Sequence, residues 1–382
     1  MLPNHTEVLI VGAGPAGLTL AISLVQRGRE VTIVDAQEES EHTSRAAVVH
    51  ARTLEVLEPL GVAKPLIARG ITVDRFAIRD RDRLLMAVPF AGLPTEFPYT
   101  LMVSQAVTEE VLTERLVALG GQVLRPLTVT TLEQDADGVT ATFADGRRLR
   151  ASYVVGADGM SSTVREQAGI GFAGGAYAES FSLADVRLSG PAVPSGEVIL
   201  YFSPAGMMVA APLPGGVYRL VATVDDAPQT PDREFLQRLL DTRGPEAARA
   251  VVTEVLWGSR FRVHHRVADR YRAGRVLLAG DAAHVHSPAG GQGMNTGITD
   301  AVVLTDALAA VLDGSSPDTL DRYGAVRRPV ALRVVALADR LTRLATAPRW
   351  LRPARNALLR VLAAVPAFRR RLALQLSGLV YR

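Results

Sequence analysis

The segment TEVLIVGAGPAGLTLAISLVQRGREVTIVDA, residues 6–36, constrains the fold of this chain more than any other. Gly12, Gly14 and Gly17 form G-x-G-x-x-G between an apolar strand-like run and a segment with helical apolar spacing. In such a unit the glycines provide the turn, the approach of the backbone to a pyrophosphate and the packing of the helix on the strand. Asp35 ends the second strand-like run, where an acid binds ribose hydroxyls and disfavours a 2′-phosphate. The pattern predicts a Rossmann-like domain that binds FAD or NAD.

Two later segments repeat the order of apolar strand, acid and helix. YVVGADGMSSTVREQAG places Asp158 and Gly159 after an apolar run and ahead of a serine-capped helix. RVLLAGDAAHVHSPAGGQGMN places Asp281 after another apolar run, with a helix predicted to begin near residues 293–294. With Asp35, the chain has three acids at predicted strand ends. A simple NAD dehydrogenase needs only the first of them, so the pattern favours FAD.

These three motifs, in this order, resemble those of the class A flavoprotein monooxygenases. That family has the fold of para-hydroxybenzoate hydroxylase and of the aromatic-polyketide hydroxylases. SRAAVVHARTLEVLEPLGV resembles the family's arginine-bearing segment, and LMVSQAVTEEVL resembles the segment with a flavin-contacting glutamine. Two positions depart from the family pattern, since Val326 replaces a frequent glutamate and Ser287 precedes Pro288. We expect no thioredoxin-like C-terminal domain of the kind that larger polyketide hydroxylases carry.

The resemblance implies a set of site residues. Pro288 and Arg45 are expected beside the reacting end of the flavin. Backbone amides at the start of a helix would stabilise negative charge on its pyrimidine end. The residues expected to bind FAD are Gly12, Gly14, Ala16, Gly17, Asp35, Arg45, Gln105, Asp158, Gly159, Asp281, Pro288, Gly291, Gly293, Met294 and Asn295.

The resemblance also implies the activity. The expected cofactor is FAD, with NADPH or NADH as co-substrate, and the expected reaction is hydroxylation of a phenolic aromatic compound through a C4a-hydroperoxyflavin. Polycyclic polyketides of antibiotic biosynthesis are among the substrates of such enzymes. Baeyer–Villiger oxygenation or epoxidation on the same fold, and flavin-dependent reduction, remain alternatives. No acid or base residue follows from the sequence.

The expected fold class is α/β, with a Rossmann-like FAD-binding domain interleaved with a smaller antiparallel-sheet substrate domain and followed by C-terminal helices. We expect the FAD domain to take residues 1–70, 100–172 and 270–340, and the substrate domain to take 71–99 and 173–269. Strand-like alternation in GEVILYFSP, GMMVAAPLP and VYRLVATVD supports the second domain. Tyr201, Phe202 and Met207 are candidate substrate contacts on these strands.

The tail, residues 341–382, has a helical pattern interrupted by Pro348, Pro353 and Pro366 and is rich in arginine and leucine. A helical cap packed on the FAD domain is the favoured interpretation. A basic amphipathic surface for a membrane or a partner is the alternative.

Composition excludes several other classes of protein. The chain has no cysteine, which removes thiol nucleophiles, disulfides and zinc thiolate sites. The net charge of +3, without a basic and aromatic stripe, argues against a nucleic-acid partner. We expect no metal at His284 and His286, no transmembrane segment, and a cytoplasmic enzyme whose partners are a small aromatic molecule and O2. The oligomeric state is left open.

Overall fold

The computed structural model of the 382-residue chain describes residues 2–38, 46–190, 194–247 and 249–382. A central sheet of order β17-β18-β11-β1-β2-β8 is built around the first motif. It is parallel from β18 to β8, while β17 pairs antiparallel with β18, and β10 and β9 extend it as an antiparallel hairpin from β11. Its strands are β1 (His5–Val11), β2 (Val31–Val34), β8 (Val123–Leu124), β9 (Val129–Gln134), β10 (Val139–Phe143), β11 (Arg148–Gly156), β17 (Arg272–Ala273) and β18 (Val276–Leu278).

A second sheet of eight strands has the order β19-β16-β12-β15-β14-β13-β5-β6. Its neighbours pair antiparallel except β13 with β5. Its strands are β5 (Arg75–Asp80), β6 (Arg83–Pro89), β12 (Phe172–Ser189), β13 (Glu197–Ser203), β14 (Gly206–Leu213), β15 (Val217–Val224), β16 (Val251–Ala268) and β19 (His284–Val285). The short strands β3 (Val48–Val49), β4 (Ile71–Val73) and β7 (Thr100–Met102) form a third sheet.

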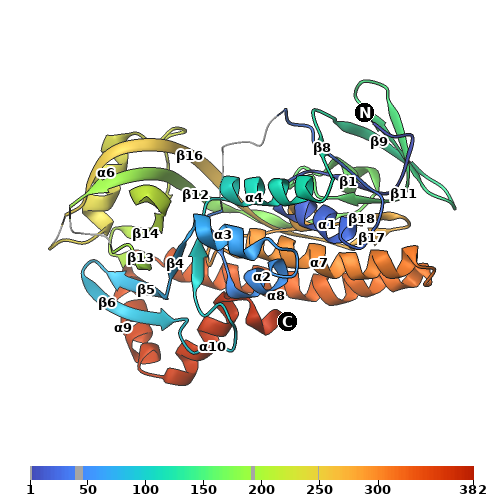
Figure 1. The fold of residues 1–382 in the computed structure, drawn as a ribbon. Coiled ribbons are helices and arrows are strands. Elements are labelled where there is room, and N and C mark those ends of the chain that lie inside the picture. The colour runs from blue at the N-terminus through green and yellow to red at the C-terminus, as the bar shows by residue number, and fades with distance from the viewer. Residues whose placement is uncertain (1, 39–45, 191–193, 248) are drawn as a thin grey trace.

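Helices cover the first sheet and close the far end of the molecule, where α9 and α10 form its lower edge (Figure 1). Several begin at a side-chain cap, as at Ser104 before α4, Ser162 before α5 and Asp232 before α6, each of which accepts a backbone N–H of the first turn. The helices are α1 (Pro15–Val25), α2 (Ala51–Leu57), α3 (Ala63–Arg69), α4 (Gln105–Ala118), α5 (Thr163–Gln167), α6 (Arg233–Arg243), α7 (Gly293–Leu312), α8 (Asp321–Ala345), α9 (Arg352–Ala363) and α10 (Pro366–Leu376). Short 3-10 turns, η1 (Pro214–Gly216), η2 (Gly280–Ala282), η3 (Pro317–Leu320), η4 (Arg349–Leu351) and η5 (Leu379–Tyr381), connect some of them.

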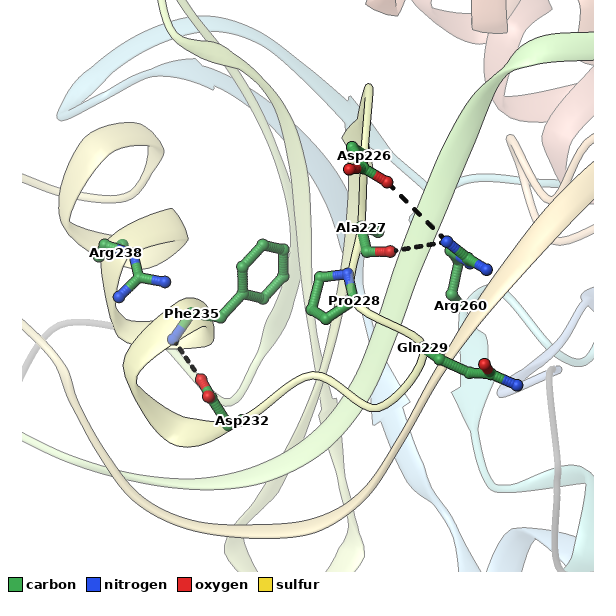
Figure 2. A pocket seen from close by; sticks show the side chains of 8 residues that line it. All are labelled: Asp226, Ala227, Pro228, Gln229, Asp232, Phe235, Arg238 and Arg260. Carbon is green, nitrogen blue, oxygen red and sulfur yellow. Dashed lines mark hydrogen bonds and ion pairs between the residues drawn. The ribbon is translucent and has the colours of Figure 1, made fainter.

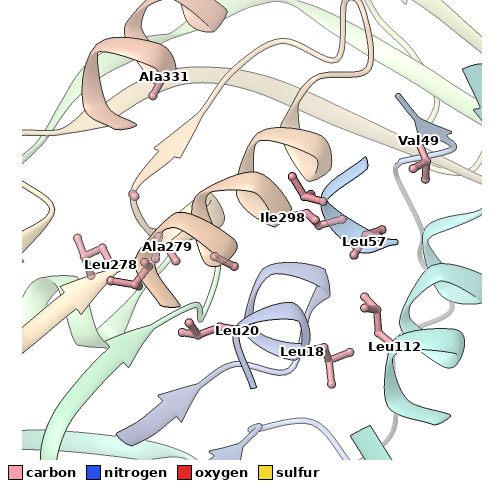
Figure 3. Packing of buried hydrophobic residues seen from close by; sticks show 14 of the residues in the cluster. Leu18, Leu20, Val49, Leu57, Leu112, Leu278, Ala279, Ile298 and Ala331 are labelled. Atoms are coloured by element: carbon pink, nitrogen blue, oxygen red, sulfur yellow. The ribbon is translucent and has the colours of Figure 1, made fainter. Parts of the chain in front are cut away.

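Helix α7 is long and apolar enough to cross a membrane by length and composition, and it is the one such helix in the described part of the chain. More than half of its apolar window, 56%, is buried inside the fold. Leu18 and Leu20 of α1 and Ile298 of α7 belong to the large buried cluster that joins the first sheet to its helices (Figure 3). The burial of α7 is therefore that of a core helix.

The predicted α/β class is confirmed, with a Rossmann-like parallel sheet, an antiparallel sheet and C-terminal helices. The chain passes back and forth between the two large sheets, as expected for interleaved domains. The limits of the two domains stay a prediction. In the tail, Pro353 does not interrupt a helix as expected, because it lies in the first turn of α9, where its missing N–H costs nothing.

Candidate active site

The three predicted strand-end acids lie along one edge of the parallel sheet. β2, β1, β11 and β18 are neighbours and run in the same direction. Asp35 directly follows β2, while Asp158 and Asp281 come two and three residues after β11 and β18. Ligands of open parallel sheets bind at the carboxyl ends of the strands, so this edge is the expected place for a dinucleotide.

The glycine turn after β1 is tight on one side and open on the other. Gly12 has a φ of 104°, and a Cβ there would lie 2.3 Å from the Ala157 carbonyl oxygen. A Cβ on Gly17 would lie 2.0 Å from the Gly12 carbonyl oxygen, so α1 packs against the turn itself. A Cβ on Gly14 would meet no protein atom within 4 Å. Gly14 thus offers bare backbone to a ligand, whereas its neighbours serve packing.

Asp35 joins the turn to its surroundings. Its Oδ2 accepts the Ala13 N–H at 2.6 Å, and its Oδ1 accepts the Gln37 N–H at 2.9 Å. Arg125 forms an ion pair with the same carboxylate at 3.3 Å. The carboxylate therefore fixes the glycine turn, and its position at the end of β2 also suits a ribose.

Asp158 has a structural role beside α5. Ser162 donates to its Oδ1 at 2.5 Å and the Val164 N–H donates to its Oδ2 at 3.1 Å. Ser162 in turn accepts the Arg165 N–H at 2.9 Å, so the predicted serine cap is confirmed. Burial raises the pKa of Asp158, against these hydrogen bonds. The side chain shapes the loop, and the adjacent Gly159 faces the cavity described below.

The loop between β19 and α7 is held by amide side chains. Asn295 donates to the carbonyls of Val48 at 2.8 Å and Gly291 at 2.7 Å, and accepts the His50 N–H at 2.8 Å. Gln292 donates to the Leu376 carbonyl at 2.9 Å, from the C-terminal helices. α7 begins at Gly293, as predicted. The N–H groups of its first turn have no partner within the helix and suit an anionic group.

His284 belongs to a buried ionic network behind this loop. Its Nε2 lies 2.7 Å from Asp300 Oδ2, and Arg327 also bonds the Asp300 carboxylate. Burial opposes ionisation of Asp300, but the charge of Arg327 and the bond from His284 outweigh it and lower its pKa. The three side chains are buried and fix α7 and α8 to the loop.

The His286 ring stacks beside that of His284, with ring centroids 6.5 Å apart, and lines a cavity. Its Nδ1 donates to the Ser287 carbonyl at 2.9 Å, which leaves Nε2 as an acceptor without a hydrogen-bond partner among the described residues. Burial lowers the pKa of His286 to about 4. The ring is therefore neutral at pH 7, with an available lone pair.

The cavity measures about 490 Å³ and extends from the glycine turn to the second sheet. Nine of the predicted cofactor residues line it, and they come from four separate chain segments. Gly12, Gly17, Asp35, Asp158 and Asn295 do not line it, and Arg45 lies outside the described residues. The nine are Gly14, Ala16, Gln105, Gly159, Asp281, Pro288, Gly291, Gly293 and Met294.

The far wall of the cavity is apolar. Phe202 and Met207 line it from β13 and β14, where they pair directly. Tyr201 does not, because successive side chains of a strand point to opposite faces. Its ring packs in a second buried cluster with Met208 and Leu240. Of the three candidate substrate contacts, Phe202 and Met207 therefore line the cavity, whereas Tyr201 does not.

Arg219 is a cavity residue that sequence reasoning missed. It is 3% exposed and makes two hydrogen bonds to Asp185, at 2.7 and 2.8 Å, and a third to the Ala46 carbonyl at 3.0 Å. Arginine inside the alternating strand VYRLVATV is the one signal that could have indicated it. Its charge is neutralised by Asp185, and it holds Ala46, which lies within the predicted arginine-bearing segment.

A second, polar pocket of about 520 Å³ lies beside α6, away from this cavity (Figure 2). Figure 2 shows Arg260 directed toward Asp226 and the Ala227 carbonyl, while Asp232 caps Phe235. It shares no residue with the cavity at the sheet edge. Its charged residues are engaged in surface pairs and turns.

The cavity fits a flat dinucleotide cofactor. Bare backbone at Gly14 and Gly159 faces open space, since a Cβ at either would meet nothing within 4 Å. At Gly293 a Cβ would meet only the His286 ring, at 3.9 Å. Together with the first turn of α7, these surfaces define a dinucleotide-binding protein whose cavity continues to an apolar wall on the second sheet.

The comparison with protein families identifies the group. A family model described as "FAD binding domain" matches residues 5–338, and the chain belongs to this family. It is 38% identical over 344 residues to the rifampicin monooxygenase of Streptomyces venezuelae, covering 86% of this chain and 69% of that protein. It is also 38% identical to the 12-dehydrotetracycline 5-monooxygenase/anhydrotetracycline 6-monooxygenase of Streptomyces rimosus, covering 86% and 68%.

Solved structures agree. The OxyS anhydrotetracycline hydroxylase from Streptomyces rimosus matches with a TM-score of 0.82 at 36% identity, over 98% of this chain and 76% of that one. The p-nitrophenol 4-monooxygenase PnpA from Pseudomonas putida DLL-E4 matches with a TM-score of 0.87 at 26% identity, over 99% of both chains. The protein is therefore an FAD-dependent monooxygenase of the aromatic-hydroxylase type, which consumes NAD(P)H and O2.

Proposed function

We propose that this enzyme hydroxylates a flat, mostly apolar phenol with several fused rings. The observation that carries the proposal is the apolar wall opposite the glycine loops. It is formed by alternate side chains of the second sheet and by the C-terminal helices. These include Phe76, Ile78, Phe181, Leu183, Leu200, Phe202, Met207, Ala211, Leu344 and Leu372.

A small carboxylate substrate fits this wall poorly. Arg219 faces the cavity, but Asp185 and the Ala46 carbonyl take its guanidinium. Arg262 lines the same cavity at an exposed position, where water screens its charge. Among the described residues, no buried and unpaired cation faces the cavity to offset the desolvation of a carboxylate. A neutral phenol carries no such cost.

FAD, when bound along the glycine turn, would accept a hydride from NAD(P)H and activate O2. Asp35 and Asp281 suit its ribose and ribityl hydroxyls, and α7 suits the negative end of its ring system. Pro288 and Arg45 remain the residues expected nearest the reaction. In the balanced reaction, one oxygen atom enters the substrate C–H bond and the other leaves as water, while NAD(P)H and one proton supply the electrons and hydrogen.

The chain itself orients the ring and excludes water. The apolar wall holds the rings against the compartment, and His286 Nε2 accepts a hydrogen bond from the substrate hydroxyl. The neutral imidazole is suited to that role because it carries a lone pair at pH 7. The low pKa makes it a positioning acceptor rather than a strong base.

The enzyme is proposed to work in the cytoplasm, where NAD(P)H is available, and to belong to antibiotic biosynthesis. The names of the two Streptomyces rimosus matches, which give 12-dehydrotetracycline and anhydrotetracycline as the compounds acted on, support the second point.

The proposal is tested by following NAD(P)H oxidation and 18O2 incorporation with fused-ring phenols and with para-hydroxybenzoate. Fused-ring phenols should stimulate NAD(P)H oxidation and gain one 18O atom at a ring carbon. An oxygen inserted next to a carbonyl would instead establish Baeyer–Villiger oxygenation, and an oxygen added across a double bond would establish epoxidation. Turnover without O2 would establish a reductase. Preference for the benzoate would refute the fused-ring proposal.

A cavity variant sharpens the test. Ala211→Phe fills the apolar wall and should lower kcat/KM for a fused-ring phenol about tenfold, but less for a single-ring phenol. Tyr201→Phe is the matched control on the opposite face of the same sheet, where the ring lies in the second cluster. It should leave both values unchanged.

A further inference from the structure

The outward side of α9, with the turn that precedes it, is apolar. Five of the thirteen strongly exposed large apolar side chains in the described part of the chain lie within residues 350–365. Trp350 is 77% exposed and Val361 66%. We call this the C-terminal apolar face; it comprises Trp350, Leu351, Leu358, Val361 and Val365.

On α9, the distribution of apolar and charged residues is the reverse of that in a helix whose outer side faces water. Its inner side contacts β6 and α10 and buries Arg355 and Leu359. From residue 353 to residue 367, every exposed residue except Arg360 is apolar. A surface helix of a globular protein normally places polar and charged residues there. The outer side of α9 is therefore suited to a second apolar environment.

The charge of the surrounding segment indicates what kind of apolar environment this side of α9 would suit. Residues 340–382 contain ten arginines and no lysine, aspartate or glutamate, whereas the whole chain has a net charge of only +3. Arg349, Arg360, Arg370 and Arg371 are exposed, and no described residue forms an ion pair with them. The C-terminal apolar face thus lies in a strongly cationic segment.

We propose that this face docks on an anionic lipid surface. Leucine and valine side chains would enter the boundary between headgroups and acyl chains, Trp350 suits its edge, and the arginines would meet the headgroups. With 12 residues, α9 is too short to span a bilayer, so the contact is peripheral. An aliphatic face without directional polar groups favours lipid over an acidic protein partner.

The proposal goes beyond the hydroxylation and does not depend on the identity of the substrate. It does have a consequence for the cavity. Leu372 and Leu376 of α10, which packs against α9, line the cavity wall. An apolar substrate dissolved in lipid would therefore reach the protein beside α10, two of whose side chains line the cavity.

The test is flotation of the FAD-loaded enzyme with vesicles of phosphatidylcholine, with and without phosphatidylglycerol. Binding should require phosphatidylglycerol and should weaken as salt is raised. In a Trp257→Phe background, Trp350 is the only tryptophan, and its emission should shift to the blue on binding. Absence of binding, or equal binding to both vesicles, would overturn the proposal.

Two variants separate the apolar and the charged contributions. Leu358→Asp/Val361→Asp and Arg360→Glu/Arg370→Glu/Arg371→Glu should each weaken vesicle binding at least tenfold, at unchanged melting temperature. The controls are Val117→Asp, at an equally exposed apolar position on α4, and Arg233→Glu, at an exposed position on α6. Both should bind vesicles as the parent does.

Sedimentation of the same proteins tests the alternative that the C-terminal apolar face binds a second copy of the chain. If the parent forms a dimer that Leu358→Asp/Val361→Asp disperses, and vesicles are not bound, the face covers a second copy of the chain and the lipid proposal is wrong.

Discussion

Thr342 on α8 and Ser287 in the loop before α7 share a hydrogen bond of 2.6 Å between their buried hydroxyl oxygens. Ser287 precedes Pro288, and its hydroxyl also accepts the Ala289 N–H at 3.3 Å. At this position, which departs from the expected family pattern, the chain has a side chain that ties the loop to α8. A residue of α8, outside the glycine-rich motif, thus helps to set the shape of the loop.

Removing that bond should loosen the loop. Thr342→Val is expected to cost about 1–2 kcal/mol of stability, because Ser287 stays buried with one partner fewer. It should also weaken FAD binding. Urea denaturation and titration of the apoprotein with FAD measure the two effects. Thr346→Val, one turn further along, removes only a bond to the backbone of its own helix and should have little effect on FAD binding.

Two glycines of the first motif should respond differently to alanine. Gly14→Ala should leave the melting temperature of the apoprotein nearly unchanged, since its Cβ meets no protein atom, but should weaken FAD binding about tenfold, or ~1.4 kcal/mol. Gly17→Ala should destabilise the apoprotein itself, because its Cβ would lie 2.0 Å from a backbone oxygen. Equal losses of apoprotein stability would contradict this division of roles.

The network around Asp300 predicts a large effect of a small change. Asp300→Asn keeps the shape of the side chain but leaves the buried Arg327 without a counter-charge. This should cost about 3–5 kcal/mol of unfolding free energy. Asp306→Asn on the same helix breaks an ion pair with Arg27 that is exposed to water and should cost less than about 1 kcal/mol. Chemical denaturation of both variants provides the comparison.

His50 predicts a dependence of stability on pH. Burial lowers its pKa from 6.5 to about 4, while its Nε2 donates to the Gly290 carbonyl at 2.9 Å. The unfolded chain therefore binds a proton that the folded chain does not, so stability is full above pH 6.5 and falls as the pH drops toward 4. The loss amounts to about 3 kcal/mol at the lower limit.

Melting temperatures from pH 7 to pH 4 check this. His50→Gln should reduce the slope of stability against pH by an amount that corresponds to at most one proton bound on unfolding. His5→Gln, at an exposed position, should not change this slope. His286, whose pKa burial also lowers to about 4, binds a proton on unfolding over the same range in both variants, and the lowered pKa of Asp300 begins to act only near its ordinary value of 3.8, at the lower end of the range. An unchanged slope in His50→Gln would show that other groups bind the proton.

Local patterns were enough to predict the scaffold of the site. The βαβ unit around Gly12, the serine cap before α5 and the start of α7 at Gly293 all follow from residues close together in the chain. Glycine, cap and helix signals are local because they satisfy the backbone within one turn.

The contacts that shape the cavity could not be predicted in this way. β13 is apolar on both faces, because one face lines the cavity and the other packs on α6. Alternation could therefore not show that Phe202 faces the cavity and Tyr201 the buried cluster beside α6. The pairing of Thr342 with Ser287, and of Gln292 with the Leu376 carbonyl, joins segments 55 and 84 residues apart. No periodicity in a single sequence carries such pairings.

The pairing of β16 with β19 has a consequence for engineering. Arg266 and Val267 pair with Val285 and His284, and the chain continues directly into His286 and the loop that opens α7. A strand of the substrate sheet is thereby in hydrogen-bonded register with the loop. A chimera that exchanges the second sheet for that of a relative, to obtain a new product, should include both halves of this pair. A junction between residues 268 and 284 would separate the two halves, and a register slip of one residue would turn His286 away from the cavity.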